Sequence, residues 1–171
     1  RIDLIQFSEK TNQISPYIFS PRETRMIFEQ KNWYRIAGFQ TQKFVHIDYE
    51  YIQEKILGDY FCDGIFINPI MDPQNKNKLK DNLVVQDYQR VTEHHTYPKN
   101  KFLLGVLVGH SYYAGFREVI FAAIRQKNYG CTHFIVERKT SPPNDFNPFK
   151  NIDRFFDQIG DIGIQPIFFN E

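Results

Sequence analysis

The stretch GFQTQKFVHIDY, residues 38–49, predicts a strand that ends in a turn and continues into a helix. In this pattern Lys43 lies in the turn and His46 lies in the first turn of the helix. A helix N-terminus that follows a strand is a common phosphate-binding device, because its free backbone N–H groups and its dipole favour an anion. We therefore expect a nucleotide or oxyanion site at the carboxyl end of this strand.

The composition of the chain is that of one ordinary globular domain. Its 171 residues are enough to bury a core, and 42% are hydrophobic while 24% are charged. The formal net charge is only +1, which gives no broad basic surface for a nucleic acid or an anionic membrane. We assign the abundant aromatic residues, 17 Phe and 10 Tyr, to packing rather than to base stacking.

Cysteine usage and hydropathy indicate a cytoplasmic protein. Cys62 and Cys131 are the only cysteines, and each adjoins an apolar run without CxxC spacing. Two buried free thiols are therefore favoured over a disulfide or a metal-binding pair, and we expect no structural metal. No apolar run approaches the ~20 residues that cross a bilayer, and the first residues do not form a signal peptide. We expect a segment of a longer protein, because the chain lacks an initial Met and stops after an apolar strand.

Five short apolar runs alternate with helical patterns. The runs are residues 34–40, 64–70, 102–109, 133–138 and 165–169. Runs that are apolar through their centres suit strands of a parallel sheet covered on both faces. The helices expected between or beside them are residues 45–57, 82–95, 116–128 and 148–159. This alternation predicts an open α/β sheet with right-handed crossovers.

A further helix is predicted before the first strand. The sequence SPRETRMIFEQKNW begins with Ser20 as the N-cap, Pro21 at the first helical position and Glu23 three residues after the cap. That is a capping box with proline in its favoured place. Two turn-rich segments, 71–81 and 139–147, follow the second and fourth runs, where ligands bind in open α/β sheets.

The chain lacks both common nucleotide fingerprints, G-x-x-x-x-G-K-[ST] and G-x-G-x-x-G. Residues 37–53, AGFQTQKFVHIDYEYIQ, instead resemble the strand-turn-helix of the ATP sulfurylase family, whose pattern is Gln-Thr-Arg-Asn-Pro-x-His-x-x-His. The stretches YYAGFREVIFAAIRQKNYGCTHFIVERK (112–139) and IGIQPIFFNE (162–171) are similar to later segments of the same family. The resemblance is collinear from about Ser20 to the last residue.

The resemblance implies a fold and a chemistry. The fold would be a Rossmann-like adenylyltransferase domain of the HUP type, with a five-stranded parallel sheet and helices on both faces. It would occupy residues 20–171 after a lead-in of residues 1–19, without the family's PUA-like domain and C-terminal continuation. The implied reaction is attack of an oxyanion on the α-phosphorus of ATP, driven by positioning and positive charge. Mg²⁺ would accompany the nucleoside triphosphate, and a homo-oligomer or additional domains are possible.

Several residues carry over from the family pattern. Gln40 and Thr41 match its Gln-Thr, and His46 matches the first histidine of its pair. Arg138 matches the arginine of Gly-Arg-Asp-His-Ala-Gly-Pro, which reaches the nucleotide phosphates in the family, and Gly115 lies in the matched Tyr-Ala-Gly. The resemblance therefore implies phosphate contacts from Gln40, His46 and Arg138 with Gly115 nearby, and a catalytic role for Thr41 and His46.

The departures from the family pattern gather at the expected pocket. Gln42 replaces the arginine that binds sulfate, and Lys43 replaces the next residue, Asn. Together with Gln40, both would lie beside the acceptor, and Lys43 would also be catalytic. An ammonium cannot form the two-pronged contact of a guanidinium, so sulfate recognition would differ. Tyr49 replaces the second histidine and can hydrogen-bond the nucleotide but cannot be a cation near pH 7. The loop ERKTSPP, 137–143, replaces Gly-Arg-Asp-His-Ala-Gly-Pro, and its Ser141 is a candidate acceptor ligand.

The sequence thus predicts an ATP sulfurylase-like nucleotidyltransferase, acting on sulfate or an altered acceptor. Two alternatives remain open. One is a catalytically degenerate domain that keeps the fold for nucleotide binding or assembly. The other is a nucleotidyltransferase, such as a cytidylyltransferase, for an acceptor other than sulfate. At single positions a structural role also stays open, with Lys43 as a solvated turn residue and Tyr49 packed on the sheet.

Overall fold

The computed structural model describes residues 15–45, 47–72, 78–93, 100–110, 114–138 and 152–169. After a short 3₁₀ turn, Ser15–Tyr17, its helices are α1 (Pro21–Gln30), α2 (Ile47–Asp59), α3 (Lys78–Glu93), α4 (Phe116–Tyr129) and α5 (Ile152–Ile159). Its strands are β1 (Ile36–Thr41), β2 (Gly64–Met71), β3 (Phe102–Leu104), β4 (Leu107–Val108), β5 (His133–Glu137) and β6 (Gln165–Phe169).

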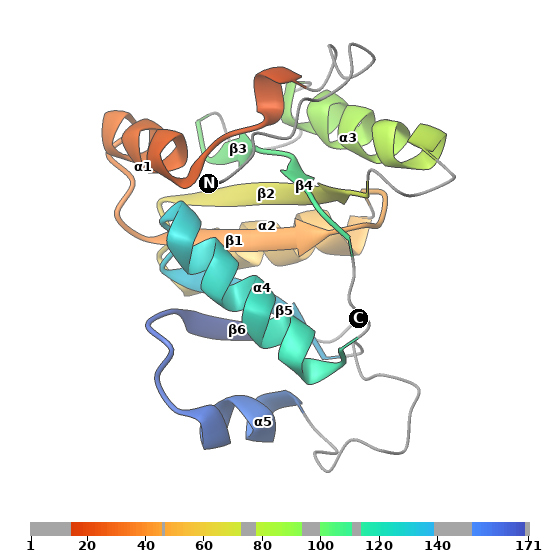
Figure 1. Ribbon diagram of the computed structural model, residues 1–171. Coiled ribbons are helices and arrows are strands. Elements are labelled where there is room, and N and C mark those ends of the chain that lie inside the picture. Colours follow the sequence, from red (N-terminus) through yellow and green to blue (C-terminus); the bar gives the residue numbers. More distant parts are fainter. Residues whose placement is uncertain are drawn as a thin grey trace, which may run out of the picture.

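The sheet runs in the order β3-β2-β1-β5-β6, and every neighbouring pair is parallel (Figure 1). The predicted five-stranded parallel sheet is therefore confirmed. β4 is an additional two-residue strand that pairs with the end of β2. The chain passes from β1 to β2 on one side, while β5 lies on the other side of β1. This reversal of strand order makes the carboxyl ends of β1 and β5 the topological switch point, where open α/β sheets bind ligands.

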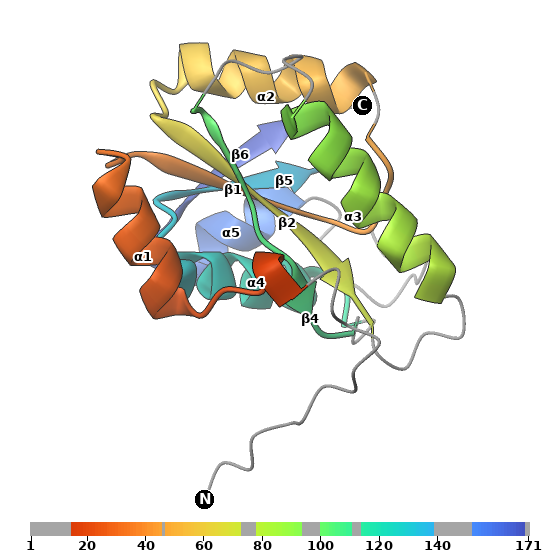
Figure 2. The ribbon, with the colours of Figure 1, turned by 90° about the horizontal axis from the view of Figure 1, so that it is seen from above.

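Helices cover both faces of the sheet, as predicted (Figure 2). On one face, α2 and α3 bury residues such as Ile56 and Tyr88 against the strands. On the other face, α1, α4 and α5 contribute Phe28, Ala123 and Phe156 to a second cluster. Burial on both faces explains why the strands read as continuous apolar runs rather than as alternating ones. None of the described helices is long and apolar enough to cross a bilayer.

The start of α1 follows its predicted capping box. The Ser20 hydroxyl accepts a hydrogen bond from the Glu23 N–H at 3.3 Å, and the Glu23 carboxylate accepts one from the Ser20 N–H at 2.7 Å. These contacts lower the pKa of Glu23, because the backbone N–H donor stabilises its ionised form. Inside the helix, the buried Thr24 hydroxyl donates to the Tyr129 carbonyl at 2.7 Å and so connects α1 to α4.

The apolar run 102–109, predicted as one strand, is divided between β3 and β4. The interruption falls at Gly105, where an added Cβ would lie only 2.4 Å from the Phe66 ring. The chain then leaves the sheet at Val106, whose backbone N–H donates a hydrogen bond to the Tyr17 carbonyl at 2.7 Å. The side-chain amide of Asn68 donates to the Gly105 carbonyl at 2.5 Å. Close packing and these two contacts bend the chain where periodicity alone predicts an unbroken strand.

Candidate functional site

The alternation of β1 divides its candidate residues between the two faces of the sheet. Ile36 belongs to the cluster under α4, whereas Phe39 belongs to the cluster under α2 and α3. Because successive side chains in a strand point to opposite faces, Gln40 lies on the α4 face and Thr41 on the α2/α3 face. The two adjacent residues of the Gln-Thr pair therefore belong to different groups of contacts.

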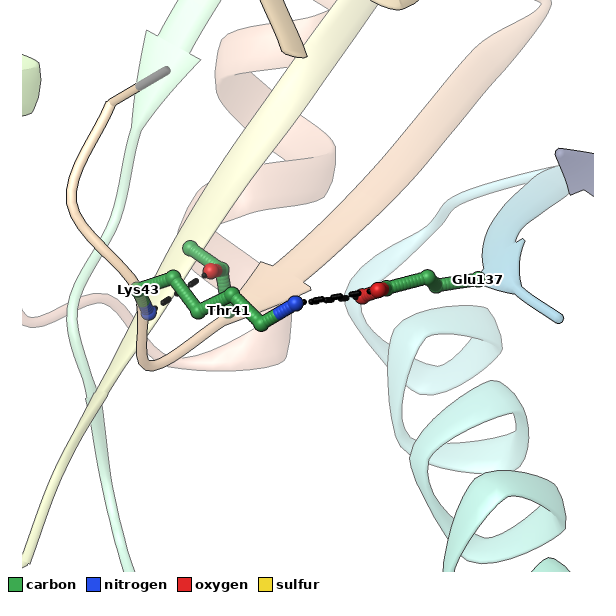
Figure 3. A network of polar contacts seen from close by, with 3 residues as sticks. All are labelled: Thr41, Lys43 and Glu137. Atoms are coloured by element: carbon green, nitrogen blue, oxygen red, sulfur yellow. Dashed lines mark hydrogen bonds and ion pairs between the residues drawn. The ribbon is translucent and has the colours of Figure 1, made fainter. Parts of the chain in front are cut away.

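On the α2/α3 face, Thr41, Lys43 and Glu137 form a polar network (Figure 3). The Lys43 ammonium lies 2.9 and 3.0 Å from the two carboxylate oxygens of Glu137. The Thr41 hydroxyl accepts a hydrogen bond from the Lys43 backbone N–H at 3.0 Å. This network connects the turn after β1 to the end of β5, so it spans the topological switch point.

The turn is also held from α3. The carboxylate of Asp87 accepts a hydrogen bond from the Val45 N–H at 2.9 Å. Asp87 is half-buried, and its bond fixes the chain just before α2 begins. Gln42, between Thr41 and Lys43, has an exposed side chain. The predicted strand-turn-helix is therefore present, and contacts from α3 and β5 stabilise its turn.

On the α4 face, Gln40 contacts a guanidinium. A terminal nitrogen of Arg125 in α4 donates to the Gln40 side-chain oxygen at 2.6 Å. The carbon at the centre of this guanidinium lies 5.2 Å from the centroid of the Phe121 ring, within the range of a cation–π contact. Arg125 was not singled out from the sequence, since nothing in its spacing on a predicted helix distinguishes it from an exposed arginine.

Beneath these residues lies a buried network of amides. Gln126 donates to the Asn68 side-chain oxygen at 2.8 Å and also receives a weak contact from the Cys131 thiol, at 3.6 Å. At Gly38 of β1, an added Cβ would lie 2.7 Å from the Gln126 side-chain oxygen, so only glycine lets α4 approach the strand this closely. This network fixes the height of α4 over the sheet and hence the position of Arg125.

At the end of β5, Arg138 has an exposed side chain that makes an ion pair with α5. Its Nε lies 3.1 and 3.3 Å from the two oxygens of Asp153, and its guanidinium carbon lies 5.5 Å from the centroid of the Phe168 ring. Gly115 precedes α4 with φ of +62° and ψ of −136°, a backbone conformation that favours glycine. Its carbonyl accepts the Glu118 N–H at 3.0 Å, which starts the helix.

Comparison with known proteins identifies the family. The family model described as ATP-sulfurylase matches residues 15–171. The chain belongs to the ATP-sulfurylase family. It is 38% identical to a sulfate adenylyltransferase of Ignicoccus hospitalis over 169 residues, which is 98% of this chain and 43% of that protein. It is also 38% identical to the sulfate adenylyltransferase of Thermococcus onnurineus over 165 residues, 96% of this chain and 42% of that protein.

The chain therefore spans less than half the length of these two ATP-sulfurylase relatives. Among solved structures, the hexameric APS kinase from Thiobacillus denitrificans matches with a TM-score of 0.71 and 17% sequence identity. That match covers 97% of this chain and 30% of the other, and it supports the α/β fold alone. The resemblance read from the sequence is thus confirmed at the level of the family.

Three candidate residues of the family pattern cannot be placed. His46 and Ser141 lie outside the described residues, and Tyr49 lies in α2 with a side chain that is not described. Gln40, Thr41, Lys43, Gly115 and Arg138 are described, and all but Gly115 have polar side-chain contacts within the protein. Sequence reasoning missed the contact residues Asp87 and Arg125, and it gave Glu137 no role. These three residues could be found only through their long-range contacts, because no local sequence motif includes them.

Neither cysteine is a candidate nucleophile, although the Cys131 thiol contacts the buried Gln126. Both thiols are free and buried, as predicted. Burial raises the pKa of Cys62 to about 11, and it raises the pKa of Cys131 as well. Such thiols remain protonated near neutral pH and are poor nucleophiles. Within the described part of the chain, no group of three His, Cys, Asp or Glu residues could hold a metal ion.

Proposed function

We propose that this chain forms the nucleotide-binding part of an ATP sulfurylase-like nucleotidyltransferase, which transfers adenylyl from ATP to an oxyanion. The observation that carries the proposal is the arrangement of Lys43 and Arg138, which follow the carboxyl ends of β1 and β5 at the switch point. Arg125 adds a third cation through its contact with Gln40. Cationic side chains near a triphosphate are what this chemistry requires of a protein, and here two of the three also face the carboxylates of Glu137 and Asp153.

In the proposed reaction an oxygen of the acceptor attacks the α-phosphorus of ATP. The bond from that phosphorus to the bridging oxygen breaks, and pyrophosphate leaves with the electron pair. Mg²⁺ enters bound to the triphosphate as part of the substrate. Gln40 and Arg138 would contact the phosphates together with His46, Tyr49 and Gly115. Gln40 would also contact the acceptor, beside Thr41, Gln42, Lys43 and Ser141, and sulfate is the first candidate acceptor.

A second candidate function is a nucleotide-binding or assembly domain without catalysis. Its support is that the described cations already have partners in the protein: Lys43 contacts Glu137, Arg138 contacts Asp153 and Arg125 contacts Gln40. A third is transfer of a different nucleotidyl group to another acceptor. The three share the fold and differ in which ligands bind and react.

Calorimetric titration with ATP and with CTP, each with Mg²⁺, tests the binding step. We expect ATP to bind, and Arg138→Gln to weaken it about tenfold because one charge-assisted contact is lost. Arg154→Gln removes the same charge from an exposed position on α5 and should leave the affinity unchanged. Binding of CTP alone would favour the third function, and no binding of either nucleotide would overturn the first and third together.

Chemistry is tested separately by molybdate-dependent release of AMP from ATP. Molybdate is a tetrahedral oxyanion, and its mixed anhydride with AMP is expected to hydrolyse. The anhydride therefore does not accumulate, and the reverse reaction does not limit the assay. We expect AMP and pyrophosphate to appear together and only when the oxyanion is present. Nucleotide binding without any release would leave the binding-domain function as the better description of the chain.

A further inference from the structure

In the turn after β1, the backbone N–H groups and the lysine ammonium already donate hydrogen bonds to oxygen atoms of the protein itself. The Lys43 N–H contacts the Thr41 hydroxyl at 3.0 Å, and the Val45 N–H contacts the Asp87 carboxylate at 2.9 Å. The Lys43 ammonium contacts both oxygens of Glu137, at 2.9 and 3.0 Å (Figure 3). A bound oxyanion would need these same kinds of donors. The turn thus already holds carboxylates in the place of an anionic ligand.

Lys43 and Glu137 are unequally exposed. The side chain of Lys43 is 55% exposed, whereas that of Glu137 is only 14% exposed. Glu137 is also the last residue of β5, so the sheet fixes its backbone, while the lysine reaches it on a flexible stem. The carboxylate is therefore the fixed partner and the ammonium the movable one. An incoming anion could draw Lys43 away, but it would remain close to the negative charge of Glu137.

The carboxylate of Glu137 departs from the family pattern that the sequence resembles. In the family pattern Gly-Arg-Asp-His-Ala-Gly-Pro, the position of Glu137 is a glycine, which has no side chain to contact Lys43. The pattern likewise has Asn at the position of Lys43 and Arg at the position of Gln42. The ion pair across the switch point thus joins two residues that both depart from the resembled pattern and lie 94 residues apart in the sequence.

We propose that Glu137 determines acceptor specificity at this site by competing with anionic acceptors for Lys43. Its carboxylate keeps the affinity for small free dianions, such as inorganic sulfate, low. Two like charges a few ångströms apart repel each other even when partly screened by water. A dianion at Lys43 must therefore break a two-oxygen contact and also overcome this repulsion. The inference rests on the proposed function, since it assumes that the acceptor binds beside this turn.

The test is the affinity for inorganic sulfate, measured by the rise in unfolding temperature at constant ionic strength. Glu137→Gln keeps the shape of the side chain and removes its charge. We expect this variant to bind sulfate roughly tenfold more tightly than the wild type, because the competing charge is lost. Adding Lys43→Met to it should remove the gain. Glu29→Gln, which removes an exposed carboxylate from α1, should leave sulfate affinity unchanged.

Equal sulfate affinity in the wild type and Glu137→Gln would overturn the inference, as would a gain that survives Lys43→Met. Should Glu137→Gln fail to fold, Glu137→Asp keeps the charge on a shorter arm, and a smaller gain in sulfate affinity is expected for it. ATP titrations on the same samples separate the two proposals. A sulfate gain without ATP binding sinks the proposed function alone, and ATP binding without a sulfate gain sinks this inference alone.

Discussion

The polar contacts beneath α4 and those at the carboxyl edge of the sheet differ in exposure. Beneath α4, Asn68 and Gln126 are 1% and 0% exposed, and their amides bond each other and the Gly105 carbonyl. At the edge, Lys43 and Arg138 are exposed and make ion pairs with Glu137 and Asp153. Buried polar groups are costly to leave unpaired, whereas exposed ion pairs exchange readily with water or ions. The first network stabilises the fold, and the second can exchange its partners for a ligand.

The comparison is tested most strongly by Gln126→Leu. This change leaves the buried side-chain oxygen of Asn68 without its donor, and we expect the free energy of unfolding to fall by about 2–4 kcal/mol. Urea denaturation followed by circular dichroism measures the loss. Gln158→Leu, at an exposed position on α5, is the matched control and should change stability by less than about 0.5 kcal/mol. Equal losses of stability at the two positions would contradict the conclusion that the buried network beneath α4 stabilises the fold.

An intermediate effect on stability is expected when the pH is lowered, because His133 is buried. Burial, and secondarily the charge of Arg35, lower the pKa of its imidazole. Above the unfolded-state pKa of about 6.5, both states hold the neutral ring and stability is independent of this group. As the pH falls below that value, the imidazole binds a proton in the unfolded state but remains neutral in the folded state. Stability is then lost by at most about 1.4 kcal/mol per pH unit, until the pH passes the lowered folded-state pKa.

The measurement for His133 is the free energy of unfolding between neutral and mildly acidic pH. The control is His133→Gln, which has no titrating group at this position. We expect the difference between the two proteins to be constant above the unfolded-state pKa and to shrink below it. Parallel curves through this range would mean that burial does not disfavour the charged ring.

The smallest effect is expected for Asp153→Asn at the edge. It removes the charge that faces Arg138, whose side chain is 39% exposed, so the free energy of unfolding should fall by less than about 1 kcal/mol. The same urea denaturation measures it. A loss as large as that of Gln126→Leu would show that the edge pair is structural, and its guanidinium would then not be available to a nucleotide.

Local sequence signals predicted the elements of this fold well. The capping box of Ser20 and Glu23 fixed the start of α1, because both of its hydrogen bonds join residues three apart. The apolar runs placed five parallel strands, since burial on both faces excludes polar residues from their centres. The division of the run at Gly105 was not predicted, because it depends on contacts with Phe66 and Tyr17 from other parts of the chain.

The candidate site was predicted less completely. The turn after β1 and the candidates Gln40, Thr41 and Lys43 came from one continuous stretch, helped by its resemblance to the ATP-sulfurylase pattern. Their partners did not, because Asp87, Arg125 and Glu137 lie 42, 85 and 94 residues away from the residues they contact. A spacing pattern can indicate that a cation belongs in a turn, but it cannot indicate which carboxylate will face it.

The sequence by itself determined the alternation of strands and helices, the capped first helix and the membership of the family. These follow from short-range hydrogen bonding, from burial periodicity and from a collinear set of motifs. Strand alternation already separates Gln40 from Thr41, but only the tertiary structure decided that Arg125 contacts Gln40 and that Glu137 faces Lys43. The physical reason is that strand order brings the ends of β1 and β5 together, so the charge of the site depends on residues that are neighbours only after folding.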